Sequence, residues 1–265
     1  MKARMSSEFI FQLFALLISV IVVHAIYVGA IRPSADAQLQ QEIELQASGA
    51  DFVPDRSLAV VIRDFEQEAC FIMLFWALAI MAYKGRRTAQ EKDIFSRALL
   101  EIPDGTSVLP EDAREYSRSL EAMPAEEQDL LLPRTLLSAL QRFATTGNIQ
   151  AVSDTIKEQC EIESDRLDSE MSMVRYIAWA IPSVGFIGTV RGIGDALGQA
   201  YKAVEGDISG VTISLGVAFN STFVALILSI IIMFCLHQLQ LSQERLVLDC
   251  QRYSDKRLMR YLVAH

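Results

Sequence analysis

Apolar residues in this 265-residue chain gather in long uncharged runs. Residues 9–31 contain no Lys, Arg, Asp or Glu, and residues 208–236 form a longer run of the same kind. Each run reaches the roughly 20 residues that cross a bilayer as an α-helix. Two less pure runs lie between them, at about residues 68–83 and 174–201. The pattern predicts an all-α polytopic membrane protein with four transmembrane helices.

These runs divide the chain into membrane and aqueous parts. We expect a first transmembrane helix in residues 1–31, a periplasmic loop in 32–65 (whose residues 35–47 could be helical), a second helix in 66–83, a cytoplasmic helical region in 84–173, a third helix in 174–202, a fourth in 208–236 and a cytoplasmic C-terminal helix in 237–265. A cleaved signal peptide is the alternative interpretation of the first run. Its apolar core is longer than the usual length of about 7–15 residues and no clean A-x-A site follows, so the sequence predicts a retained helix.

Positive charge near the helix ends predicts the orientation, because Lys and Arg concentrate on the cytoplasmic side of a membrane. The basic residues that flank the four runs on this side are Lys2, Arg4, Lys84, Arg86, Arg87, Arg175, Arg245 and Arg252. The first outer loop dilutes its basic residues with acidic ones, and the second sets Lys202 against Glu205 and Asp207. All four helices agree on one orientation in the bacterial inner membrane, with both termini in the cytoplasm.

The long segment between the second and third runs is predicted to be a bundle of helices. A Pro-Asp-Gly turn signal lies at residues 103–105, Pro124 with two following glutamates is typical of a helix start, and Gly147-Asn148 separates two helices. The helix that begins after Asn148 has no terminator before the third run. We therefore expect it to continue unbroken into the membrane, and the C-terminal tail to continue the fourth helix.

Composition argues against several classes of function. A formal net charge of −9 is not that of a nucleic-acid binder. The four cysteines form neither a disulfide framework nor a metal-ligand spacing. No segment has a catalytic pattern, so we expect no enzyme activity, no metal and no cofactor.

The third and fourth runs differ from the bulky apolar first run in their choice of residues. They present small residues and one proline at helical spacing: Pro182, Gly185, Gly188, Gly192, Ser214, Ala218 and Ala225. Small residues at this spacing let helix backbones approach closely in a membrane. We expect these positions to line a pore or pack a partner helix, and tight helix packing alone is the alternative.

Hydroxyl groups lie near the centre of both runs. At a rise of ~1.5 Å per residue, Thr189 and Thr222 would lie within a few ångströms of the same membrane plane, and Ser221 adjoins them. Polar side chains at this depth face protein or water rather than lipid. A hydroxyl both donates and accepts, so it can relay a proton or complete the shell of a dehydrated cation. These three residues predict an ion pathway.

Arg191 and Asp195 are the charged residues in the interior of the third run. They are four residues apart, so they can pair along one helix face. An interfacial pair that reaches toward water is one interpretation. A gate or a partner contact at the outer mouth of the pathway is the other.

The motif AIPSVGFIGTVRGI at residues 180–193 resembles the AP-x-x-GLxGTVxGI signature of the MotA/TolQ/ExbB proton-channel family. Residues 213–229, with GVAFNST at 216–222, resemble its second signature, GIxxALxxTxxGL. The resemblance implies five copies around two copies of a small partner whose single membrane helix carries an aspartate. It maps the family's channel threonines onto Thr189 and Thr222, and its proline onto Pro182.

The resemblance predicts an ion-conducting subunit of a membrane motor complex, which converts ion-motive force into mechanical work. Val217 stands where the TolQ and ExbB branches carry Glu, so the titrating carboxylate would come from the partner. A non-conducting scaffold that packs a partner helix is the alternative. A secondary transporter is weaker, because the two halves show no inverted repeat. The sequence leaves open which process is powered and whether the ion is H⁺ or Na⁺.

Overall fold

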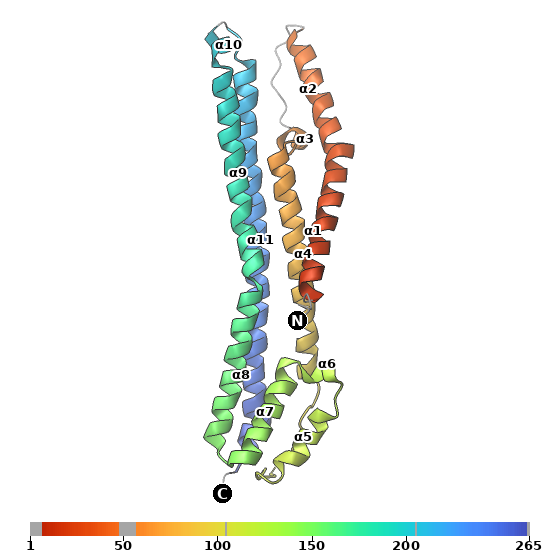
Figure 1. The fold of residues 1–265 in the computed structure, drawn as a ribbon, viewed down its shortest axis with the longest axis vertical. Helices are drawn as coiled ribbons and strands as arrows, with labels where there is room; N and C mark the ends of the chain where they lie inside the picture. Colours follow the sequence, from red (N-terminus) through yellow and green to blue (C-terminus); the bar gives the residue numbers. More distant parts are fainter. Residues whose placement is uncertain (1–6, 48–56, 104, 205, 264–265) are drawn as a thin grey trace, which may run out of the picture. The chain divides into compact units, whose positions relative to one another are not determined.

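The computed structural model describes residues 7–47, 57–103, 105–204 and 206–263. These residues fold almost wholly into helices (Figure 1). Four helical stretches among them are long and apolar enough to cross a membrane: Glu8–Gln41, Phe65–Ser96, Ile149–Gly198 and Ser209–Tyr261. The prediction of a helical chain with four candidate membrane spans is confirmed.

The chain divides into two compact units. The first comprises Met1–Ala82 and Met173–Leu236, and the second comprises Tyr83–Ser172 and His237–His265. The first unit therefore contains the apolar part of each candidate span. The second contains the more polar continuations of the same helices, together with the segment between the second and third runs.

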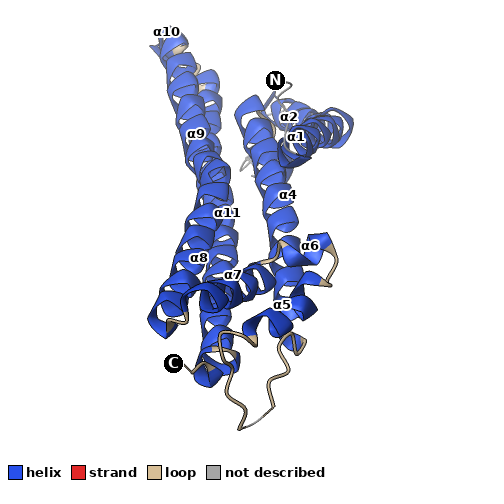
Figure 2. Cartoon of the chain, turned by 60° about the horizontal axis from the view of Figure 1, so that its bottom comes forward, coloured by secondary structure: helices blue, strands red, loops and turns tan. Residues whose placement is uncertain are grey.

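In the first unit, the N-terminal helix extends well past the predicted span. Helix α1 (Ser7–Ile26) passes through a π-helical turn (Tyr27–Ile31) directly into α2 (Arg32–Ala47). The polar stretch at residues 35–47 is thus helical. After α3 (Leu58–Val61), helix α4 (Phe65–Asp93) runs beside α1, as Figures 1 and 2 show.

Helices α9 (Ser172–Gly198) and α11 (Ser209–Arg257) form an antiparallel pair joined through the short helix α10 (Ala200–Val204). The two helices lie side by side in both views of the chain (Figures 1 and 2). Helix α11 is 49 residues long, so the predicted continuation of the fourth helix into the tail is confirmed up to its end.

The expected helix from residue 149 into the third run is confirmed, with one irregular residue in it. Helix α8 (Ile149–Glu170) ends before Met171, and α9 begins immediately after it. The amide N–H of Met171 bonds to the carbonyl oxygen of Asp168, three residues earlier, at 3.1 Å. This tighter turn interrupts the regular α-helical pattern at one residue.

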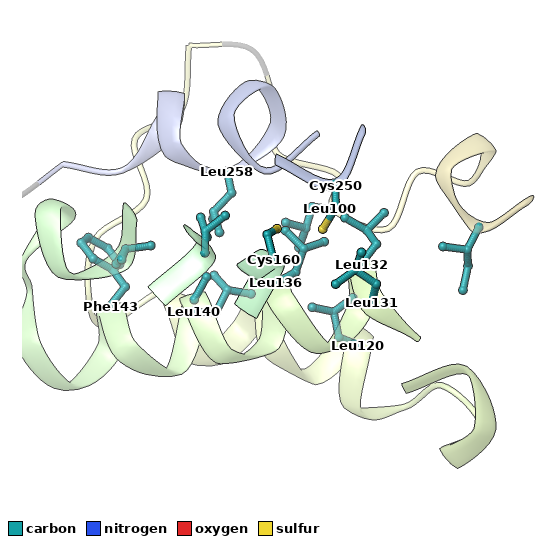
Figure 3. Packing of buried hydrophobic residues seen from close by; sticks show 14 of the residues in the cluster. Leu100, Leu120, Leu131, Leu132, Leu136, Leu140, Phe143, Cys160, Cys250 and Leu258 are labelled. Carbon is teal, nitrogen blue, oxygen red and sulfur yellow. The ribbon is translucent and has the colours of Figure 1, made fainter. Parts of the chain in front are cut away.

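The second unit is a helical bundle with its own apolar core. Helices α5 (Ala113–Glu121), α6 (Ala125–Gln128) and α7 (Leu131–Thr146) pack with α8 and the end of α11. Buried side chains from these helices gather in one cluster (Figure 3), which includes Leu132, Leu136, Leu140, Phe143, Cys160 and Cys250. Their burial removes a continuous apolar surface from water, which stabilises the bundle.

Two predicted helix boundaries in this unit are confirmed. Pro124 directly precedes α6. Gly147 ends α7 with a φ of 59°, a left-handed conformation that glycine adopts without a Cβ clash. Asn148 then begins α8, and its side chain accepts hydrogen bonds from two backbone N–H groups of the first turn. Asp104, in the predicted Pro-Asp-Gly turn, lies outside the described residues, as do Lys2, Arg4 and Glu205 of the orientation argument.

Candidate functional site

Thr189 on α9 and Thr222 on α11 face each other across the helix pair. Their Oγ1 atoms lie 2.5 Å apart, so the two residues share one level as the helical rise predicted. The Thr222 hydroxyl lies 3.2 Å from the carbonyl oxygen of Gly185, and the Thr189 hydroxyl lies 3.0 Å from that of Ala218. Both threonines are half-buried. The structure thus gathers four oxygen atoms from two helices at one point.

This cluster has more acceptors than donors. Each hydroxyl carries one proton, while each carbonyl oxygen only accepts. The two carbonyl oxygens also accept the helical N–H groups four residues later, so the lone pairs that remain for an incoming donor or cation are those of the two hydroxyl oxygens. Such an arrangement can pass on a proton or ligate a cation that has lost part of its water.

The predicted small residues bring the backbones of α9 and α11 together within one chain. A Cβ added at any of the three glycines on this face of α9 would lie 2.5–2.8 Å from an atom of α11, which is closer than real Cβ contacts. The pairs are Gly185 with Ala225, Gly188 with Ser221, and Gly192 with Ala218. Ser214 accepts a hydrogen bond from Gln199 at 3.0 Å. The role of these small residues in packing a partner helix stays a prediction.

Pro182 lies inside α9 without ending it. Because proline has no N–H, the carbonyl oxygen of Ala178, four residues earlier, has no intrahelical partner. An unpaired carbonyl is costly in a membrane, so it needs a donor from elsewhere.

Arg191 forms an ion pair with α4 rather than along its own helix. Its guanidinium contacts Glu66 through two bonds, Nε to Oε1 at 2.7 Å and Nη2 to Oε2 at 2.8 Å. A two-point contact between Arg and a carboxylate fixes geometry as well as charge. Asp195, the partner that the spacing suggested, is exposed. The outer-gate role of these two residues stays a prediction.

The role of the first turn of α4 was not predicted from the sequence. Three consecutive polar residues lie at the start of this apolar helix: Glu66, Gln67 and Glu68. Their position at one end of an apolar run was the feature of the sequence that could have indicated their role. Glu68 is buried and holds the N-terminal helix, because its carboxylate contacts His24 Nδ1 at 2.7 Å and Arg32. Polar residues at the start of a membrane helix therefore connect three helices of the first unit.

Asp64 lies just before this turn and outside the candidate spans. Burial raises the pKa of its carboxyl above the ordinary value, and the nearby Arg63 and Arg191 offset part of that rise. Arg191 therefore acts on two carboxyl groups of the same segment. Among the described residues, no cluster of three or more His, Cys, Asp or Glu side chains is arranged to hold a metal ion.

The sequence model of the MotA/TolQ/ExbB proton channel family matches residues 127–252. This match covers just under half of the chain and supports the assignment to the family that the two signatures suggest. The match contains both threonines of the hydroxyl pair and the whole of the α9–α11 contact. No curated protein and no solved structure matches the chain. The match and the four apolar helices together indicate a membrane subunit of the proton-channel type.

Proposed function

We propose that the chain is the ion-conducting subunit of a membrane motor complex, with H⁺ or Na⁺ as the ion. It would convert ion-motive force into mechanical work through a partner subunit with a single membrane span. The observation that carries this proposal is the hydroxyl pair of Thr189 and Thr222, with its surplus of lone pairs, inside an apolar helix pair.

The partner would supply the titrating carboxylate. Val217 stands one turn before Ser221 on α11, where other branches of the family carry Glu. The carboxylate of Glu66 already forms an ion pair with Arg191. An aspartate on the partner's helix would take up the ion beside the threonine pair, and the hydroxyls would help to exchange it.

Conduction requires several copies of the chain. One α9–α11 pair cannot enclose a pathway, because a pore needs walls on every side. We infer a homo-oligomer, a pentamer by family resemblance around a dimer of the partner, in the bacterial inner membrane with both termini cytoplasmic. Helices α9 and α11 would line the axis and α1 would face lipid, where its side chains are bulky and exposed. Arg191 and Asp195 would lie at the outer mouth.

A non-conducting scaffold is the second candidate. The close contact of glycines on α9 with α11 favours it equally, because such packing needs no ion. The two functions differ in what the assembled complex does in a sealed membrane.

The experiment uses the complex with its partner. A gene neighbouring this one that encodes a short protein with one apolar span and an Asp within it would identify the candidate partner. The two proteins would be co-purified and reconstituted in vesicles, and H⁺ and Na⁺ flux measured under an imposed potential. We expect flux of one of the two ions. A stable complex in vesicles that stay tight to both ions would establish the scaffold instead.

A further inference from the structure

A buried amide on α4 contacts the hydroxyl of Ser221, the neighbour of Thr222 in the chain, from outside the α9–α11 pair. Gln67 is fully buried, and its Nε2 donates a long hydrogen bond of 3.4 Å to the Oγ of Ser221. The Ser221 hydroxyl in turn donates to the carbonyl oxygen of Val217 at 2.9 Å, and Ser221 adjoins Thr222 in the chain. Gln67 therefore extends the set of oxygen-bearing groups onto a third helix.

The contacts of Gln67 fix the direction of its amide. Its Nε2 also donates to the carbonyl oxygen of Val61 at 3.2 Å. A carbonyl oxygen only accepts, so the nitrogen must lie on that side. The Oε1 atom then occupies the other branch of the amide, where it is buried and accepts no hydrogen bond from the described residues. A buried acceptor of this kind carries a free-energy penalty unless a donor or a cation reaches it.

This oxygen differs in kind from the other buried, unpartnered side-chain atoms of the described chain. Those are hydroxyls, which can also donate, and nitrogens, which donate: they belong to Tyr27, Arg134, Thr135, Gln243 and Ser254. Gln67 Oε1 can only accept. Oxygens of amide and carbonyl groups are ligands for hard cations and replace the water of a permeating ion in channels.

Gln67 is also the neutral member of the polar first turn. Its neighbours Glu66 and Glu68 are ionic partners of Arg191 and Arg32. A path must bind an ion strongly enough to admit it and weakly enough to release it. A neutral amide oxygen beside a hydroxyl meets that requirement better than a free carboxylate.

We propose that Gln67 Oε1 ligates the small monovalent cation that passes the threonine pair, a hydronium or a sodium ion, and that the Ser221 hydroxyl, which accepts from Nε2, holds the amide in this direction. This inference rests on the proposed function. It makes α4 a wall of the ion path, although the family signatures lie on α9 and α11 alone. It also gives a functional reason for a fully buried amide at the start of an apolar helix.

Three variants of the full chain test the proposal in vesicles that contain the complex with its partner. Gln67→Met keeps the length of the side chain and removes both polar atoms. Gln67→Glu keeps an oxygen at the same reach. Gln243→Met is the matched control, since Gln243 is also a buried amide with an unpartnered atom but lies in the second unit. Fluxes of H⁺ and of Na⁺ are measured separately, which distinguishes the two ions.

We expect Gln67→Met to lower the flux of the conducted ion about tenfold or more, Gln67→Glu to lower it less because a ligand oxygen remains but releases the ion more slowly, and Gln243→Met to leave it unchanged. A Gln67→Met complex that conducts as well as the unmodified one would contradict this inference and leave the proposed function standing. An unmodified complex that conducts neither ion would overturn the proposed function, and the inference with it.

If Gln67→Met fails to assemble, Ser221→Ala provides the second test. This change removes only one oxygen and adds no atom near Gly188, so assembly should survive. We expect its flux to fall in the same way as that of Gln67→Met. A Ser221→Ala complex with unchanged flux would contradict this role of Ser221 and, with it, the assignment of Gln67 Oε1 as an ion ligand.

Discussion

The hydroxyl of Ser229 on α11 donates a 3.1 Å hydrogen bond to the carbonyl oxygen of Ala178 on α9. Ala178 precedes Pro182 by four residues, so this is the carbonyl that the proline leaves without an intrahelical partner. A side chain of α11 thus donates the hydrogen bond that the backbone of α9 cannot supply at this carbonyl. Pro182 can stay inside an apolar helix because α11 supplies the missing donor.

Removal of this donor should therefore destabilise the helix pair only while the proline is present. We expect Ser229→Ala to lower the free energy of unfolding by about 1 kcal/mol, a typical net value for such a bond. In a Pro182→Ala background the N–H of the alanine donates to the carbonyl oxygen of Ala178. Ser229→Ala should then change the free energy of unfolding only slightly. Unfolding in mixed detergent would be measured for both backgrounds. Equal costs in the two would show that Ser229 acts in some other way.

Gly188 should not tolerate even one methyl group. A Cβ there would lie 2.5 Å from the Cβ of Ser221 and 3.2 Å from the Cγ of Glu66. Overpacking of this kind typically costs about 1–3 kcal/mol, so Gly188→Ala should lower the unfolding temperature and weaken assembly. Gly194→Ala is the control on the same helix, because nothing lies within 4 Å of its added Cβ. Similar losses in both variants would contradict the close approach of α9 and α11.

The contribution of Arg191 to the stability of the chain should depend on Glu66 and not on Asp195. Because Arg191 is 43% exposed, the ion pair is worth about 1 kcal/mol at most in water-like surroundings. We expect Glu66→Gln to lower the unfolding temperature, and Asp195→Asn to leave it nearly unchanged. The exchange of both charges, Glu66→Arg with Arg191→Glu, should recover part of the loss. A larger effect from Asp195→Asn than from Glu66→Gln would favour the pairing along α9.

The sequence predicts the helices and the threonine pair well because both follow from local periodicity. Thr189 and Thr222 share a level once each run is taken as a helix, and that needs no knowledge of packing. The contacts of Glu66 and Gln67 were missed for a physical reason. They join α4 to residues more than 100 positions away, and no spacing rule within one helix relates such positions. The Ser229 hydroxyl and the carbonyl oxygen of Ala178 likewise meet only in the folded chain.

The orientation can be tested with single cysteines in a Cys235→Ser background, since the other three native cysteines are buried. Ala37 on α2 and Ser119 on α5 are both exposed. We expect Ala37→Cys to react with an impermeant maleimide in intact cells, and Ser119→Cys to react only after the membrane is opened. The reverse labelling would overturn the proposed orientation.

The most direct test of the account is ion flux through the assembled complex after the two hydroxyls are removed one at a time. Thr189→Val and Thr222→Val keep the shape of each side chain, so the ring and its partner should remain together by native mass measurement. We expect flux to fall about tenfold in each variant, the effect of ~1.4 kcal/mol on a barrier. Unchanged flux in both assembled variants would contradict the assignment of this pair as the ion pathway.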